Sequence, residues 1–192
     1  IYKPTTENIT QSVYEYEYNT TAKIEEWGLI NTWDLSEVTS LNGTFKDLHY
    51  FNHDISSWDV SQVTNMDRTF YQAYRFRQDI SAWDTSKVTS MRELFYKCDS
   101  MLNNLPWNTS SVLDMHGTFS HAYEFNGPLN WDTSNVLDMS MMFYNAQYFN
   151  QPLDWDTRKV TTMESMFFGA MAFNEDITSW NTTNVQNMRN MF

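Results

Sequence analysis

Hydrophobic and polar positions repeat along the chain with a fixed period. Tryptophans recur at separations of 25, 25, 24, 24, 24 and 25 residues. Each begins a similar segment, as in Trp58-Asp-Val-Ser-Gln-Val-Thr-Asn-Met66. A period of this size is typical of a solenoid, in which small units stack because none can bury its apolar face alone. We therefore expect a structural ladder of tryptophans: Trp33, Trp58, Trp83, Trp107, Trp131, Trp155 and Trp180.

The apolar positions after each tryptophan predict two elements per unit. Spacings of four, three and three residues separate Met66, Phe70, Ala73 and Phe76, which favours one face of a short helix or of a helical turn running into a 3₁₀ turn. The next aliphatic residue precedes a tryptophan, as Ile80 precedes Trp83, and the segment is too short for a second helix. We expect a strand there, stacked in parallel on its neighbours. The predicted fold is an α/β repeat solenoid with one short parallel strand and one short helix per 24–25-residue coil.

We expect the chain to consist of two parts, an N-terminal cap and a stack of coils. Residues 1–26 form an N-terminal cap, in which residues 5–18 are either an amphipathic helix over the first coil or, because Tyr14, Tyr16 and Tyr18 alternate, a short edge strand. Residues 27–192 form about seven coils. The C-terminal end carries no polar cap, so we expect the native chain to continue or another subunit to stack there. The first residue is Ile1 instead of Met, which suggests a processed or trimmed chain and is compatible with an earlier signal peptide.

A column of acidic residues follows the tryptophans. Carboxylates along one edge of a solenoid can bind calcium. The alternative, which we favour, is an Asx or N-cap turn that starts the next helix, because Asn occupies the same place at Asn108 and Asn181 and would weaken a cation site. No cofactor or metal is otherwise expected. The calcium candidates are Asp34, Asp59, Asp84, Asp132 and Asp156.

A second polar column follows the last phenylalanine of each unit. Arg77 and Leu102 interrupt it. Such residues can hydrogen-bond the backbone of adjacent coils from inside the solenoid, so we interpret them as a structural ladder. Its members are Asn52, Asn126, Asn150 and Asn174.

Composition narrows the class of protein. A hydrophobic content of 41% with 17% aromatic residues excludes a disordered tail, and a net charge of -12 disfavours nucleic-acid and anionic-membrane partners. Cys98, the only cysteine, excludes a disulfide framework and stands where other units have Ala, so we expect a small buried residue. No apolar run is long enough to span a bilayer. Five sequons point to N-glycosylation on a secretory route, and the alternative is that a chain rich in Asn and Thr contains such triplets by chance: Asn8, Asn19, Asn42, Asn108 and Asn181.

The pattern Phe-Asn-X-Asp-Ile-Ser-X-Trp-Asp-Val-Ser-X-Val-Thr-X-Met-X-X-X-Phe resembles the bacterial surface protein repeat of about 26 residues, a relative of the BspA-like leucine-rich repeats. The resemblance runs from about Trp27 to Phe192 and departs from the pattern at residues 101–107. It implies a leucine-rich-repeat-like solenoid, secreted or at the cell surface, with roles in adhesion and interaction.

Candidate catalytic groups are few. His49 and His53 have a spacing compatible with a metal, but Phe51 between them is a core position, and His116 and His121 are expected on different faces. We interpret all four as solvated and expect no enzyme.

We therefore expect a non-catalytic extracellular or cell-surface module for adhesion or for end-to-end assembly into a filament or coat. Its partners would be proteins, among them copies of itself, or glycans. The alternative is a carbohydrate-binding or carbohydrate-active protein that uses tyrosines outside the core: Tyr50, Tyr71, Tyr74, Tyr96, Tyr123, Tyr144 and Tyr148.

Overall fold

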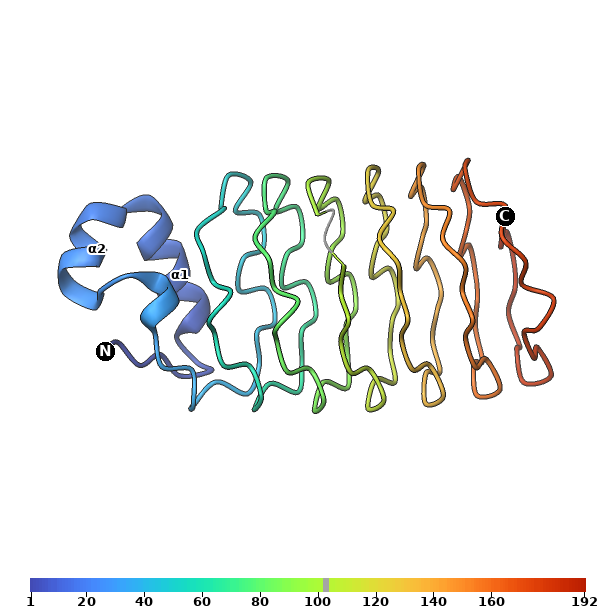
Figure 1. Ribbon diagram of the computed structural model, residues 1–192, viewed down its shortest axis with the longest axis horizontal. Coiled ribbons are helices and arrows are strands. Elements are labelled where there is room, and N and C mark those ends of the chain that lie inside the picture. Colours follow the sequence, from blue (N-terminus) through green and yellow to red (C-terminus); the bar gives the residue numbers. More distant parts are fainter. Residues whose placement is uncertain (102–103) are drawn as a thin grey trace.

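The protein is a row of coils stacked along one axis. The structure, a computed structural model, describes residues 1–101 and 104–192. The coils lie side by side, with two helices at the N-terminal end and the C-terminal residues at the opposite end (Figure 1). Leu102, the interruption expected in the asparagine column, and Asn103 lie outside the described residues.

Regular secondary structure is confined to the N-terminal region. Helix α1 spans Ile9–Tyr18, α2 spans Thr20–Trp27, and a 3₁₀ helix, η1, spans Ile30–Thr32. In the part of the chain that the structure describes after Thr32, no helix or strand occurs. Successive coils meet in isolated parallel bridges, one residue wide, at Ser40, Asn65, Ser90, Asp114, Asp138, Thr162 and Asn187. The predicted α/β fold with a helix and a strand in every coil is therefore wrong.

The segment predicted as a helix is a run of tight turns. The N–H groups of Leu41, Gly43 and Phe45 donate to the next coil, at 2.9 Å each. The N–H groups that follow Gly43 and Phe45, on Thr44 and Lys46, donate to the carbonyl oxygens three residues back, at 3.0 and 3.1 Å. An α-helix requires each N–H to bond four residues back. Because every second N–H bonds the neighbouring coil instead, the segment cannot be helical, although its turns also bring apolar side chains to one side.

The segment predicted as a strand is also folded into a turn. The Trp58 N–H donates to the Ile55 carbonyl oxygen at 3.1 Å. The same oxygen accepts the indole Nε1–H of Trp83, from the next coil, at 3.2 Å. The Ile55 carbonyl therefore joins two coils through a side chain, where a sheet would use a backbone ladder.

The core consists of columns of identical or similar side chains. The rings of Phe45 and Phe70 stack with centroids 5.0 Å apart, and those of Phe70 and Phe95 at 5.5 Å. Met66 and Phe70 are fully buried, and the same positions repeat this burial in the later coils as far as Met163 and Phe167, whereas Met188 and Phe192 at the C-terminal end are exposed. The predicted packing role of the methionines and phenylalanines is therefore confirmed, with turns in place of helices.

The single cysteine belongs to this core. Cys98 is buried, and its thiol donates to the Ala73 carbonyl oxygen at 3.3 Å. Burial raises the pKa of the thiol above its ordinary value. A neutral, enclosed thiol is a small core residue, as the sequence predicted.

The two N-terminal helices lie against the first coil. Of the two alternatives for residues 5–18, the structure has the helix. Helix α1 buries Ile9, Val13 and Tyr16, and the Tyr16 ring meets the edge of Trp33 at 5.5 Å. Helix α2 buries none of its residues fully. Within the described residues, no helix is long and apolar enough to cross a membrane.

Candidate functional site

A column of aromatic side chains runs along the outside of the coils. Tyr71 and Tyr96 stack with centroids 4.4 Å apart and planes within 8°, and Tyr144 stacks on Phe168 at 5.2 Å. Each follows a buried core phenylalanine directly, as Tyr71 follows Phe70, so its side chain is half-buried or exposed at the surface. Burial raises the pKa of Tyr71, which stays a neutral phenol. We call these four residues the tyrosine column.

The tyrosine column is interrupted in one coil. Ser120 occupies the position of Tyr96 and Tyr144, and Gly117, with φ of 61°, occupies a left-handed position where neighbouring coils carry Glu93 and Met141. A Cβ on Gly117 would lie 3.2 Å from Glu93 Cγ. Two small residues therefore leave a hollow of about 250 Å³ between Tyr96 and Tyr144.

His121 lies between the two tyrosines in this hollow. Its ring centroid is 5.2 Å from that of Tyr96 and 5.2 Å from that of Tyr144. Asn145 Nδ2 lies 3.2 Å from Nε2, and Ser120 Oγ lies 3.0 Å from Nδ1. An amide nitrogen is a donor, so Nε2 accepts and Nδ1 carries the proton that Ser120 Oγ accepts. Burial, with a smaller effect of Lys97, lowers the pKa of His121, in agreement with a neutral ring.

His116, also part of the lining, is held by a chain of hydrogen bonds. The Ser140 hydroxyl donates to Asp138 Oδ1 at 2.5 Å, and its oxygen lies 2.7 Å from His116 Nδ1. Because the hydroxyl proton goes to Asp138, Nδ1–H of His116 must donate to Ser140. In the neutral ring, Nε2 is then left with its lone pair as a hydrogen-bond acceptor.

Glu93 supplies the acidic group of the hollow. Arg68 Nε donates to its Oε2 at 2.5 Å. This ion pair offsets the charge of Glu93 and leaves Oε1 as a further acceptor. The hollow therefore combines two tyrosine rings with the hydrogen-bonding groups of His116, Glu93 and Ser120.

Two of the four histidines line this hollow. In the two described ranges, no group of three or more His, Cys, Asp or Glu side chains is placed to hold a metal ion. His116 and His121 were expected on different faces and in solvent, and this prediction is wrong, because both line the hollow and are half-buried. The prediction assumed helical spacing, whereas the chain there is a run of turns. The signal available in the sequence was Ser120, which interrupts the aromatic series that runs from Tyr71 to Phe168 at this position.

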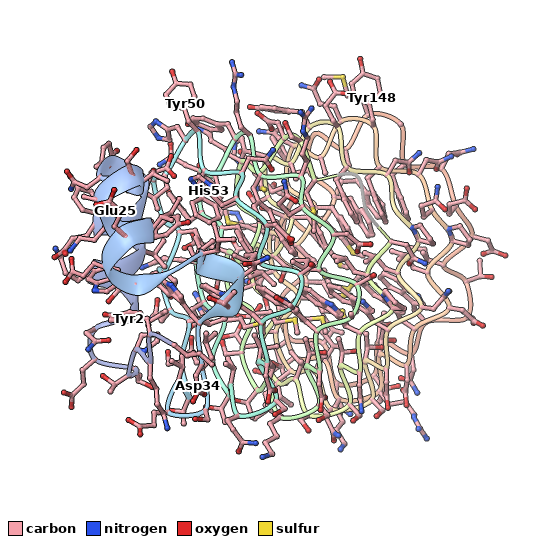
Figure 2. All side chains as sticks on the ribbon, turned by 60° about the vertical axis from the view of Figure 1, so that its left-hand side comes forward. Tyr2, Glu25, Asp34, Tyr50, His53 and Tyr148 are labelled. Atoms are coloured by element: carbon pink, nitrogen blue, oxygen red, sulfur yellow. The ribbon has the colours of Figure 1, made fainter. Side chains whose placement is uncertain are left out.

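The other histidine pair does not converge on one site. The ring of His49 is exposed and stacks on Tyr74 at 4.8 Å. His53 is half-buried, with Nε2 3.2 Å from Glu17 Oε2 of α1. The expectation of full solvation therefore fails for His53. Among the remaining candidate tyrosines, Tyr50 and Tyr148 are exposed at one edge of the stack and point away from it (Figure 2).

The aspartates after the tryptophans form turns. Oδ1 of Asp34, Asp59, Asp84 and Asp132 accepts the backbone N–H of a serine two residues on, at 2.9 to 3.0 Å. Asp156 Oδ1 accepts the Arg158 N–H at 3.1 Å. These bonds lower the pKa of each carboxyl group, and that of Asp156, which also binds the Arg158 guanidinium, falls to about 2. The aspartates form Asx turns, but no helix follows them.

All five sequon asparagines are exposed: Asn8, Asn19, Asn42, Asn108 and Asn181. Asn108 and Asn181 also form the Asx turn, with Oδ1 accepting the N–H two residues on at 3.1 and 2.9 Å. A glycan is carried on Nδ2, so the turn and a glycan at these positions are compatible.

The asparagine column links coils at the surface. Oδ1 of Asn52, Asn126 and Asn150 accepts the backbone N–H of Arg77, Asn150 and Asn174 in the following coil, at 3.0, 2.9 and 2.8 Å. These asparagines are exposed or half-buried, so the expectation that they bond from inside the stack is wrong.

The tryptophan ladder holds coils together through the indole N–H. Nε1 of each later tryptophan donates to a backbone oxygen in the preceding coil, as Trp107 does to Ile80 at 3.0 Å. The other bonds of this kind are Trp58 to Ile30, Trp83 to Ile55, Trp131 to Leu105, Trp155 to Leu129 and Trp180 to Leu153. Trp33 belongs to the first coil, and its Nε1 is buried without a partner among the described residues.

Comparison with known proteins identifies a repeat family. No curated protein and no solved structure matches the chain. A family model matches residues 11–130 and 128–192, which together span most of the chain and include the hollow. This supports a repeat protein, while the narrower relation to the 26-residue surface repeat stays a prediction. The chain belongs to the family described as Mycoplasma protein of unknown function, DUF285.

Proposed function

We propose that the protein is a non-catalytic interaction module at the cell surface or outside the cell, and that it binds its partners through the tyrosine column. The observation that carries this proposal is the column itself, in which Tyr71, Tyr96, Tyr144 and Phe168 recur on one side of the stack at the surface. Tyrosine offers a large apolar face and a polar tip, which suits recognition surfaces.

The packing of the coils supports a scaffold role. Columns of buried Trp and Phe stack through the molecule, and inter-coil hydrogen bonds recur in each coil. A close-packed interior holds the surface residues in fixed positions. Surface placement is supported by the exposure of all five sequon asparagines and by the resemblance to bacterial surface repeats. End-to-end assembly stays a prediction that electron microscopy of the purified protein tests.

The proposal is tested by adhesion of purified protein to cells and to extracellular-matrix proteins. The variant Tyr71→Ser/Tyr144→Ser should bind roughly tenfold more weakly than the wild type, because it removes two aromatic faces. Tyr148→Ser is the matched control, since Tyr148 is 59% exposed and lies outside the column. Equal binding by the column variant, or no binding by the wild type to any surface, would contradict the proposal. Protease treatment of intact producing cells tests the location, and a protected protein would argue against it.

A further inference from the structure

We propose that the hollow between Tyr96 and Tyr144 is a binding site for a single neutral pyranose ring. This inference deepens the proposed function and rests on it, because it assigns a ligand to the interrupted coil of the tyrosine column. The shape of the hollow, its hydrogen-bonding groups and its charge support this assignment.

The shape of the hollow leaves aromatic surface available to a ligand. Tyr71 stacks on Tyr96 from one side, and Phe168 stacks on Tyr144 from the other. Between them Ser120 leaves the column without an aromatic residue at its position, and His121, 5.2 Å from each tyrosine centroid, lines the hollow. A volume of about 250 Å³ is below the roughly 300–1,000 Å³ of sites for drug-sized ligands, so it suits one ring. The C–H face of a pyranose is apolar and packs on an aromatic face.

The polar groups match a ring that carries several hydroxyls. In the neutral ring of His116, Nε2 is an acceptor when Nδ1–H donates to Ser140, and Glu93 keeps Oε1 as an acceptor beside its bond to Arg68. Ser120 Oγ accepts from His121, so its own proton is available to donate. Acceptors and a donor at the edge of aromatic surface complement hydroxyl groups, each of which both donates and accepts.

Charge disfavours the other small ligands. A phosphate or sulfate would need Arg or Lys in the lining, and the lining residues include neither; Lys97 lies outside the lining, with Nζ 5.6 Å from the Tyr96 ring centroid. An organic cation would need an unpaired carboxylate, but the carboxylate of Glu93 is paired with Arg68. A neutral polyhydroxylated ring requires neither charge.

The binding groups are positioned before any ligand arrives. His116 is held through Ser140 by Asp138, and His121 is held between Ser120 and Asn145. Fixed side chains lose little conformational entropy on binding, which favours affinity.

The test begins with a glycan array, followed by calorimetric titration of the wild type with the bound monosaccharide or its methyl glycoside. The variant Ser120→Tyr restores the residue type of the neighbouring coils and fills the hollow. It should lose affinity by roughly tenfold or more while keeping the thermal unfolding midpoint of the wild type. His116→Phe should also weaken binding, since it keeps a ring but removes the acceptor. Tyr148→Ser should bind as the wild type does.

The outcomes separate the two proposals. Unchanged sugar affinity in Ser120→Tyr, or no sugar bound by the wild type, overturns the pyranose site. Adhesion that depends on Tyr71 and Tyr144 but persists in Ser120→Tyr supports the interaction module and overturns only the pyranose site. Loss of both sugar binding and adhesion in Ser120→Tyr, with an unchanged unfolding midpoint, supports the two together.

Discussion

At the scale of single residues, the left-handed backbone positions are the most unusual feature of the chain. Ten non-glycine residues among those described have positive φ, as Arg68 and Gln72 do at 53° and 57°. They form two columns, one residue per coil, which include Gly43, Gly117 and Gly169. A non-glycine residue pays about 1 kcal/mol for this conformation. These turns direct alternate N–H groups to the next coil, and the inter-coil hydrogen bonds offset the strain.

The glycines in these columns differ in the space around them. A Cβ on Gly169 would fall on Asn145 Oδ1, whereas a Cβ on Gly43 would meet nothing closer than Lys46 Cβ at 3.9 Å. Both Gly169→Ala and Gly43→Ala carry the left-handed penalty, and Gly169→Ala should lose about 1 kcal/mol more because Asn145 must move. Urea unfolding of the two variants measures the difference. Equal destabilisation would contradict the predicted contact.

The aspartates of the Asx turns make the stability of the folded protein depend on pH in the acidic range. The folded pKa of Asp156 is lowered from 3.8 to about 2, chiefly by the Arg158 guanidinium. A lowered folded pKa stabilises the protein above the unfolded value and loses that stabilisation as the pH falls through the folded value. The thermal midpoint should therefore fall between pH 4 and pH 2, modestly, because Asp156 lies near the surface.

The matched variant for this prediction is Asp156→Asn, which keeps an oxygen acceptor for the turn but does not titrate. Thermal unfolding of both proteins between pH 5 and pH 2 should show a shallower loss in the variant. A wild-type midpoint that stays constant over this range, or identical slopes for both proteins, would count against the role of Asp156.

At the scale of the repeated element, the tryptophan of a coil packs in the core and also hydrogen-bonds the backbone of the preceding coil. Trp107 donates its Nε1–H to Ile80, whereas Trp33 Nε1 is buried and unpaired in the part of the chain described. Trp107→Phe and Trp33→Phe remove the same ring volume, but only the first breaks a hydrogen bond. Trp107→Phe should therefore be more destabilising by about 1 kcal/mol, measured by chemical denaturation. If Trp33→Phe lowered the free energy of unfolding as much as Trp107→Phe does, the result would argue against a stabilising role for the indole hydrogen bond.

The sequence pattern indicates where this element lies, but the helix predicted from that pattern is wrong. The spacing of Met66, Phe70, Ala73 and Phe76 is consistent with a helix and equally with successive three-residue turns. The spacing of apolar residues predicts which side chains lie on the same side of an element. A helix and a run of turns both place these four side chains together. The partner of each N–H decides between them, and for Met66 and Phe70 it lies in another coil.

At the scale of the whole molecule, stability is shared between neighbouring coils. Aromatic stacking and inter-coil hydrogen bonds join each coil to the next one. Deleting residues 131–154 removes one period and joins Asn130 to Trp155, which restores the Leu-Asn-Trp pattern. Because contacts are between neighbours, this variant should unfold cooperatively at a lower midpoint.

Deleting residues 131–142, half of the same period, is the matched control. The columns of Trp and Phe then fall out of register, so this variant should not fold. Calorimetry and near-ultraviolet circular dichroism distinguish the two results. Loss of cooperative unfolding in the full-period deletion would show that distant coils depend on one another.

The sequence by itself determined the repeat, its period, the side chains that form the core and the turns at the aspartates. Each of these depends on residue type and spacing within one coil. The tertiary structure decided the backbone hydrogen bonding, the surface position of the asparagine column and the hollow at Ser120. These depend on contacts between residues about 24 positions apart, whose geometry no local pattern specifies. Tyr96, His121 and Tyr144 come from successive coils, and only the stacking of those coils brings them together.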